Sequence, residues 1–140
     1  MSRSFTTFVD INAPAQRVWD VMRDIERWHE WTASVSSIER LDAGPLAVGS
    51  RVRIRQPRLS PALFIVTAIE EGRGFTWETS SPGVRAVADH WIEGITDGSR
   101  VTLSLCFSGM LGPLMAFFMR NLINRYMEME AAGLKQRSEK

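Results

Sequence analysis

Apolar and polar side chains alternate strictly between residues 100 and 107. The apolar set is Val101, Leu103, Leu105 and Phe107, and the polar set between them is Thr102, Ser104 and Cys106. A period of two places one set on each face of a β-strand. The pattern therefore predicts a half-buried strand of an antiparallel sheet.

A helical pattern follows this strand. Pro113 suits the first turn of a helix, because its ring fixes φ and its missing N–H needs no partner there. Apolar residues then recur every three or four positions up to about residue 136, at Leu111, Met115, Phe118, Leu122, Tyr126 and Met129. A helix of about 25 residues is about 37 Å long. A curved sheet that holds such a helix leaves a hollow between the two, where we expect a function to lie.

The remaining pattern predicts one strand, two short helices and five further strands. The first strand covers residues 5–11, and a helix follows it with Asn12 as N-cap and Pro14 in its opening turn. A second short helix covers residues 24–31, with Asp24 as its cap. The five strands cover residues 35–41, 51–56, 63–70, 75–80 and 84–95. Short turns between consecutive strands favour an antiparallel meander and an α+β fold.

Length and composition indicate an ordinary globular protein. A chain of 140 residues is expected to form one domain, residues 1–140. The hydrophobic fraction is 44%. The formal net charge of +1 gives no general attraction for nucleic acids or membranes. No segment has the about 20 apolar residues that span a bilayer, and the first residues lack a signal-peptide core. We therefore expect a cytoplasmic protein without nucleic-acid partners or stable membrane insertion.

Several kinds of chemistry have no basis in the sequence. Cys106 is the one cysteine, so neither an intrachain disulfide nor a thiol-rich zinc site can form. The chain has two histidines, His29 and His90, and no cluster with metal-ligand spacing. It also lacks a glycine-rich phosphate loop and a Ser-His-Asp set. We expect no metal and no cofactor.

Five short motifs carry a family resemblance. They are Ala13-Pro14-Ala15-Gln16-Arg17-Val18-Trp19, Trp28-His29-Glu30-Trp31, Val48-Gly49-Ser50-Arg51, Phe75-Thr76-Trp77, and Gly98-Ser99-Arg100-Val101-Thr102 followed by Gly109. In this order the chain resembles the helix-grip superfamily of START lipid-transfer domains, birch-pollen allergen proteins and polyketide cyclase/dehydrase-like (SRPBCC) proteins. The resemblance implies a seven-stranded antiparallel sheet wrapped around a long C-terminal helix. It also implies an apolar ligand cavity between them.

His90 is the candidate catalytic residue. It shares a predicted strand face with Ala86, Ala88 and Ile92, and the small alanines leave room for a cavity wall. A histidine facing inward there could act as a general acid or base, or hydrogen-bond a ligand. The alternative is a structural histidine that only orients its neighbours.

The other candidates are ligand-binding residues. Trp28 and Trp31 share a helical face and could form an aromatic wall or simply close the core. Trp77 and Gln56 are expected to point inward from their strands. On the terminal helix the resemblance favours pocket lining by Met115, Phe118 and Leu122, while Arg125 at the edge of the stripe could reach a ligand carboxylate.

Three functions remain open. The one we expect is a binding or carrier module for a small hydrophobic or amphipathic molecule such as a lipid, polyketide or aromatic metabolite. An alternative is a polyketide cyclase/dehydratase-like enzyme that uses His90 with Arg125 or Tyr126. A further alternative is a protein-interaction module. Some relatives implied by the resemblance are homodimers, and the sequence leaves the oligomeric state open.

Overall fold

The computed structural model describes residues 2–140. Its strands are β1 (Ser2–Ile11), β2 (Ser37–Arg40), β3 (Arg51–Arg55), β4 (Ala62–Glu70), β5 (Gly74–Ser81), β6 (Val84–Ile95) and β7 (Gly98–Ser108). Its helices are α1 (Ala15–Arg23), the 3-10 helix η1 (Ile25–Glu30) and α2 (Gly112–Ser138). Every element predicted from the sequence is present, with ends that differ by a few residues.

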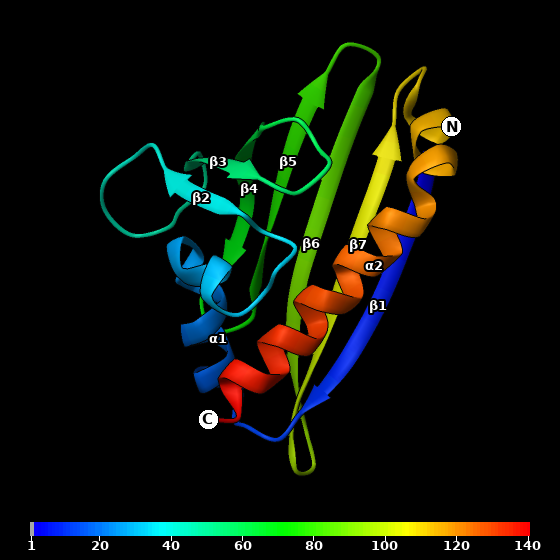
Figure 1. Ribbon diagram of the computed structural model, residues 1–140. Helices are drawn as coiled ribbons and strands as arrows, with labels where there is room; N and C mark the ends of the chain where they lie inside the picture. Colours follow the sequence, from blue (N-terminus) through cyan, green and yellow to red (C-terminus); the bar gives the residue numbers. More distant parts are fainter. Residues whose placement is uncertain (1) are drawn as a thin grey trace.

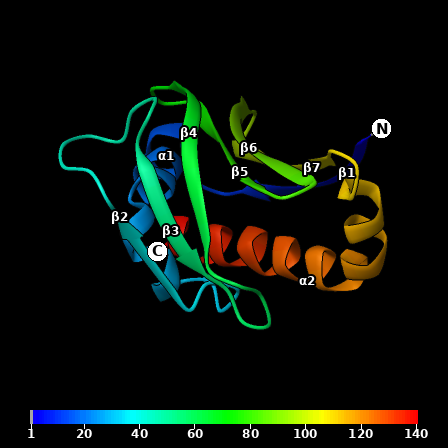
Figure 2. The same ribbon diagram turned by 90° about the horizontal axis from the view of Figure 1, so that it is seen from above.

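The seven strands form one antiparallel sheet in the order β1-β7-β6-β5-β4-β3-β2. The strands after β1 follow each other as the predicted meander. β1 instead pairs with β7 at the opposite edge, because α1 and η1 carry the chain across to β2 (Figure 1). α2 runs diagonally over the inner face of the sheet, with α1 at its C-terminal end (Figures 1 and 2). This is the helix-grip fold.

One of the two predicted helix caps, Asn12, is wrong. Pro14 occupies the N-cap position of α1 without a side-chain cap, whereas the backbone N–H of Asn12 donates to Glu139 at 2.8 Å. Asp24 occupies the N-cap position of η1, as predicted, although its side chain makes no capping hydrogen bond. Proline's fixed φ is enough to start α1, so the chain does not need an asparagine cap.

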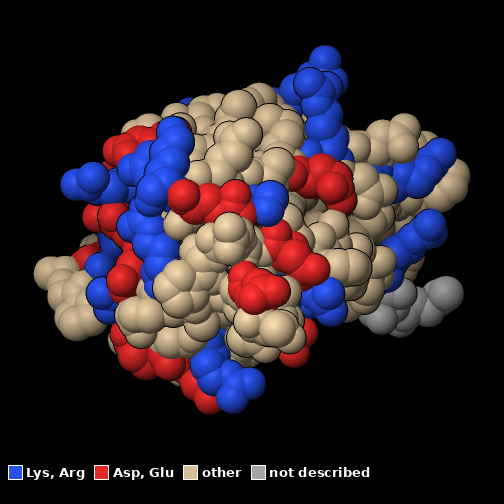
Figure 3. Space-filling model, turned by 90° about the horizontal axis from the view of Figure 1, so that it is seen from below, with Lys and Arg blue, Asp and Glu red and all other residues tan. Residues whose placement is uncertain are grey.

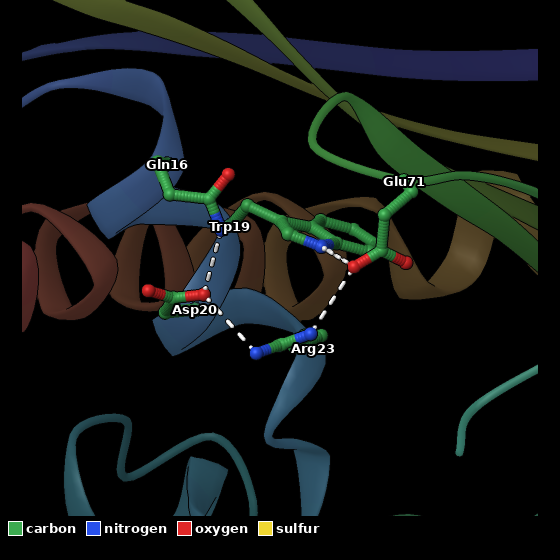
Figure 4. A network of polar contacts seen from close by, with 5 residues as sticks. All are labelled: Gln16, Trp19, Asp20, Arg23 and Glu71. Carbon is green, nitrogen blue, oxygen red and sulfur yellow. Dashed lines mark hydrogen bonds and ion pairs between the residues drawn. The ribbon is translucent and has the colours of Figure 1, made fainter.

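Glu71, in the turn after β4, anchors α1 to the sheet. The indole Nε1–H of Trp19 donates to its carboxylate at 3.0 Å, and Arg23 contacts the same oxygen at 3.1 Å (Figure 4). Arg23 also pairs with Asp20 at 3.3 Å, and Asp20 accepts from Gln16 at 2.9 Å. Trp19 is itself fully buried, so this network fixes how α1 enters the core.

Gly133 allows the backbone of Trp31, the residue that follows η1, to lie directly against α2. A Cβ at this position would stand 2.0 Å from the carbonyl oxygen of Trp31, far inside van der Waals contact. Glycine is the one residue that fits such an approach of two backbones. The contact holds the segment that carries Trp28 against the C-terminal half of α2.

Candidate functional site

His90 lies on the inner face of β6, as the alternation predicted. It is 4% exposed, and Ala86 and Ile92 on the same face are also buried. The neighbouring carboxylate, Asp89, points to the outer face and accepts a hydrogen bond from the hydroxyl of Thr76 at 2.6 Å. The strand therefore directs its histidine, and not its acidic residues, toward α2.

Aromatic rings enclose the imidazole of His90. The Phe75 ring stacks on it with 4.4 Å between centroids and 14° between planes. The rings of Trp28 and Trp77 each stand 5.5 Å from it, from η1 and β5. We call these four residues the aromatic cluster. The indole N–H of Trp28 donates to the carbonyl of Met22 at 2.9 Å, so its only polar atom is satisfied away from the histidine.

Glu130 of α2 faces His90 across the interior. Its carboxylate oxygen Oε2 lies 3.5 Å from Nε2 of the imidazole. The other ring nitrogen, Nδ1, lies 3.3 Å from the carbonyl oxygen of Phe75. A carbonyl can only accept, so Nδ1 carries the hydrogen and a neutral His90 presents a bare Nε2 to Glu130. Two groups that can each hold a proton therefore face each other across 3.5 Å.

Burial shifts the two pKa values in opposite directions. It lowers the pKa of His90 to about 4, although the Phe75 carbonyl and the charge of Asp89 favour the protonated ring. It raises the pKa of Glu130 to about 7. Loss of hydration penalises each charged form. Between about pH 4 and about pH 7 the imidazole is therefore neutral, and the proton of the pair resides on Glu130.

The inner face of the sheet is incompletely covered next to this pair. Ala88, two residues before His90, and its cross-strand neighbour Leu105 are half-buried. The residues on either side of Ala88 on the same face, Ala86 and His90, are buried. Glu130 also keeps 20% of its side chain exposed. Open surface therefore lies beside the carboxyl group, between the aromatic cluster and the apolar contacts nearer the start of α2.

The loop between β3 and β4 reaches α2 on this side. Tyr126 donates a hydrogen bond from its hydroxyl to the carbonyl oxygen of Pro57. Gln56 and Leu59 in the same loop are half-buried. This contact joins the end of β3 to the helix that carries Glu130.

The structure brings together only part of the predicted ligand-binding set. Trp28, Trp77, Ala88 and His90 lie close to one another on the inner side of the sheet. Trp31 packs behind Trp28, with ring centroids 5.4 Å apart. Gln56, in the loop after β3, stands at the margin of this region and not within the aromatic cluster.

The face of α2 that was expected to line the pocket is not the buried one. Met115 is 37% exposed, Phe118 is 73% exposed and Arg125 is exposed, while Leu122 is half-buried. The side chains that meet the sheet are Ala116, Ile123, Ala131 and Leu134. Ala116 and Ile123 each follow a residue of the predicted stripe by one position, a rotation of about 100°. The first turns of α2 are apolar on every side, so spacing alone did not identify the inner face.

Glu130 was missed for the same reason. It follows Ile123 by seven residues and precedes Leu134 by four, so it lies on the buried face of α2. The predicted stripe passes through Met129 and does not include Glu130. A stripe drawn through Ile123 and Leu134 would have found it.

Two pockets lie elsewhere, near the C-terminal end of α2. They measure about 340 Å³ and about 180 Å³, and both are lined by Trp31 and Arg137. Arg137 is paired there with Glu30 at 2.6 Å. Neither pocket is lined by His90 or Glu130, so neither is the hollow expected between the sheet and the helix at this pair.

Comparison with known proteins identifies the family of the chain. The family model described as polyketide cyclase / dehydrase and lipid transport matches residues 2–139. None of the curated proteins matches the chain in sequence.

Solved structures share the whole fold at low sequence identity. The aromatase/cyclase ZhuI from Streptomyces sp. R1128 is 16% identical, with a TM-score of 0.80 over 99% of this chain and 94% of that one. Ara h 8.0201 is 12% identical, with a TM-score of 0.77 over 99% of this chain and 98% of that one. Hypothetical protein jhp0584 from Helicobacter pylori is 15% identical, with a TM-score of 0.81 over 99% and 88% of the two chains. At these identities the likeness establishes the fold alone.

Proposed function

Because the chain belongs to the polyketide cyclase/dehydrase and lipid transport family, we propose that it binds a small apolar molecule between the sheet and α2. The polar end of that molecule lies against the His90–Glu130 pair. The observation that carries this proposal is the pair itself, with its nitrogen and oxygen 3.5 Å apart among aromatic rings. Within residues 2–140 the pair has no polar partner beyond the Phe75 carbonyl. Burying these polar groups carries a cost, and the pair offers a polar anchor to a ligand in an otherwise apolar interior.

The incomplete cover over Ala88 and Leu105 supports a place for the apolar part of the ligand. Trp77 pairs with Ala88 across the strands and offers an aromatic wall on one side. On the other side Met119 and Met127 of α2 are half-buried. Methionine side chains adapt to irregular apolar shapes, so this boundary can accommodate a ligand with small movements.

The charges of the interior favour an uncharged ligand. Glu130 is the more exposed member of the pair, so it meets the ligand first. His90 is neutral near pH 7, and Arg125 is exposed on the far side of α2. A ligand carboxylate would therefore find no cation beside it and would be repelled whenever Glu130 ionises. A hydroxyl or carbonyl group could instead hydrogen-bond to the carboxyl group.

Matched aromatic probes test this proposal. Tryptophan fluorescence is followed while uncharged naphthol or the naphthoate anion is added at neutral pH. Naphthol is expected to bind, and to bind tighter than naphthoate. The Glu130→Gln variant is expected to bring the two affinities closer, whereas Glu128→Gln, two positions earlier on α2, changes neither. Failure of naphthol to bind, or a preference for naphthoate in the unaltered protein, would contradict the proposal.

A second function is favoured by the presence of two proton-holding groups, His90 and Glu130, at this site. In a cyclase/dehydratase reaction a base removes a proton from the carbon next to a carbonyl, and an acid protonates the hydroxyl that leaves as water. Glu130 could exchange protons with the ligand at either step, and the imidazole of His90 behind it could accept or return the proton. Loss of water from an uncharged aromatic β-hydroxy ketone is expected to stop in His90→Ala while the far-UV circular dichroism is unchanged. Full turnover in that variant would exclude the enzymatic function.

A further inference from the structure

The first turns of α2 and the turn before them expose a continuous run of large apolar side chains. Met110 is 91% exposed and Phe118 is 73% exposed. We call the full set the α2 apolar patch: Met110, Leu111, Leu114, Met115, Phe117 and Phe118, all of them exposed. On the opposite side of the same turns Ala116 is completely buried against the sheet. A helix that is apolar all round is normally covered all round, so the outer side of these turns lacks its cover.

The charges beside the patch have one sign. Residues 109–127 contain two arginines, Arg120 and Arg125, and no acidic residue. In the part of the chain that the structure describes, neither arginine forms an ion pair. The guanidinium of Arg120 instead lies 4.5 Å from the centre of the Phe117 ring. A cation is therefore held at the edge of the exposed aromatic surface.

The patch occupies one end of the molecule. Figure 2 shows the start of α2 at the end remote from α1 and β2. At that same end, on the right of Figure 3, the visible charged atoms are basic and the acidic ones gather toward the middle and left. Apolar side chains rimmed by cations at one end of a molecule can all touch a flat surface at once.

We propose that the α2 apolar patch docks on an anionic lipid surface. Phe117 and Phe118 would enter the boundary between headgroups and acyl chains, and Arg120 and Arg125 would meet lipid phosphates. A second copy of the chain fits less well, because a symmetric contact would bring four unpaired arginines together without any carboxylate. No helix among the described residues is long and apolar enough to cross a membrane, so the contact is peripheral.

Co-sedimentation with vesicles tests this inference without reference to any ligand in the interior. The full chain is mixed with vesicles of phosphatidylcholine alone or of phosphatidylcholine with phosphatidylglycerol. Binding is expected only with the anionic lipid, and to weaken as salt is added. Phe118→Ser is expected to reduce binding about tenfold, and Arg120→Gln with Arg125→Gln about thirtyfold.

A matched control comes from the outer face of the sheet. Leu63 on β4 is 42% exposed, and Leu63→Ser is expected to leave vesicle binding unchanged. Circular dichroism checks that each variant keeps its fold. The inference is overturned if the unaltered protein binds neither vesicle or binds both equally, or if Phe118→Ser binds as well as Leu63→Ser. It is also overturned if sedimentation equilibrium shows a stable dimer that Phe118→Ser dissociates, because the patch would then be a subunit interface.

Discussion

Replacing either His90 or Glu130 alone should make the stability of the protein depend on pH, in opposite directions for the two variants. Glu130 has its pKa raised from 4.5 to about 7, so the folded state holds this proton more tightly. Its contribution to stability is fully present below the unfolded pKa and is lost as the pH rises through about 7. His90 has its pKa lowered from 6.5 to about 4. Its contribution is present above 6.5 and is lost as the pH falls toward about 4.

In the intact pair these two effects nearly cancel. Between the unfolded pKa values the folded pair binds one proton, on Glu130, and the unfolded chain also binds one, on His90. Stability depends on pH only where the two states bind different numbers of protons. The unaltered protein should therefore have a nearly flat stability profile between about pH 5 and about pH 8.

Each single variant removes one of the two opposing effects, so the pH dependence due to the remaining residue becomes measurable. In Glu130→Gln, His90 is the one titrating member of the pair that remains. The protein should then become less stable by about 2 kcal/mol when the pH falls from about 8 to about 5. In His90→Gln, Glu130 is the titrating member that remains. The protein should then become more stable by about 2 kcal/mol over the same fall in pH. A loss of stability that is the same at every pH does not affect the result, because the comparison uses only the change of the unfolding free energy with pH within each variant.

The assay is urea unfolding, followed by tryptophan fluorescence at several pH values in this window. His29→Gln, at the exposed histidine, serves as the matched control and should leave the flat profile intact. Parallel slopes in the two pair variants, or slopes with the signs exchanged, would refute the opposite protonation of His90 and Glu130.

Four other substitutions test the packing around the site. Trp28→Ala should lower the free energy of unfolding by about 3–5 kcal/mol; a loss in urea unfolding below about 1 kcal/mol would contradict the burial argument. Gly133→Ala should lower the free energy of unfolding by about 3 kcal/mol or more, because its Cβ would meet the Trp31 carbonyl at 2.0 Å. An unchanged midpoint of thermal unfolding would disprove that contact. Tyr126→Phe should lower the free energy of unfolding by about 1 kcal/mol and speed hydrogen exchange of the backbone amides in residues 56–61. Unchanged exchange rates would show that contacts other than the Tyr126 hydroxyl hold this loop. Ala88→Trp should abolish naphthol binding while the protein stays folded, and undiminished binding would place the ligand elsewhere.

Most of the fold follows from local patterns in the sequence. Strand β6 was predicted with its observed ends, because Gly83 and the Asp97-Gly98 turn bound a long run of residues with period two. The inward direction of His90 followed from the same period. The resemblance to helix-grip proteins added the relation of the sheet to α2, which no local pattern contains.

The candidate site was less predictable, for reasons that can be named. A helix that is apolar on all sides gives no single stripe, so Phe118 was placed inside although it is largely exposed. That rotation also hid Glu130, whose role depends on a partner forty residues earlier in the chain. The enclosure of His90 by Trp28 and Phe75 depends on side-chain packing between η1 and the sheet. Such contacts between distant segments leave no periodic signal in one sequence.

Native mass spectrometry of the protein purified from its own host tests the central claim most directly. Anything bound would be released and identified, and Ala88→Trp would be purified in parallel. Our account predicts one uncharged apolar molecule with a hydroxyl or carbonyl group, present on the unaltered protein and absent from the variant. A carboxylate ligand, or a ligand retained equally by Ala88→Trp, would contradict the site proposed beside Glu130. A bare protein that also fails to bind naphthol would contradict ligand binding itself.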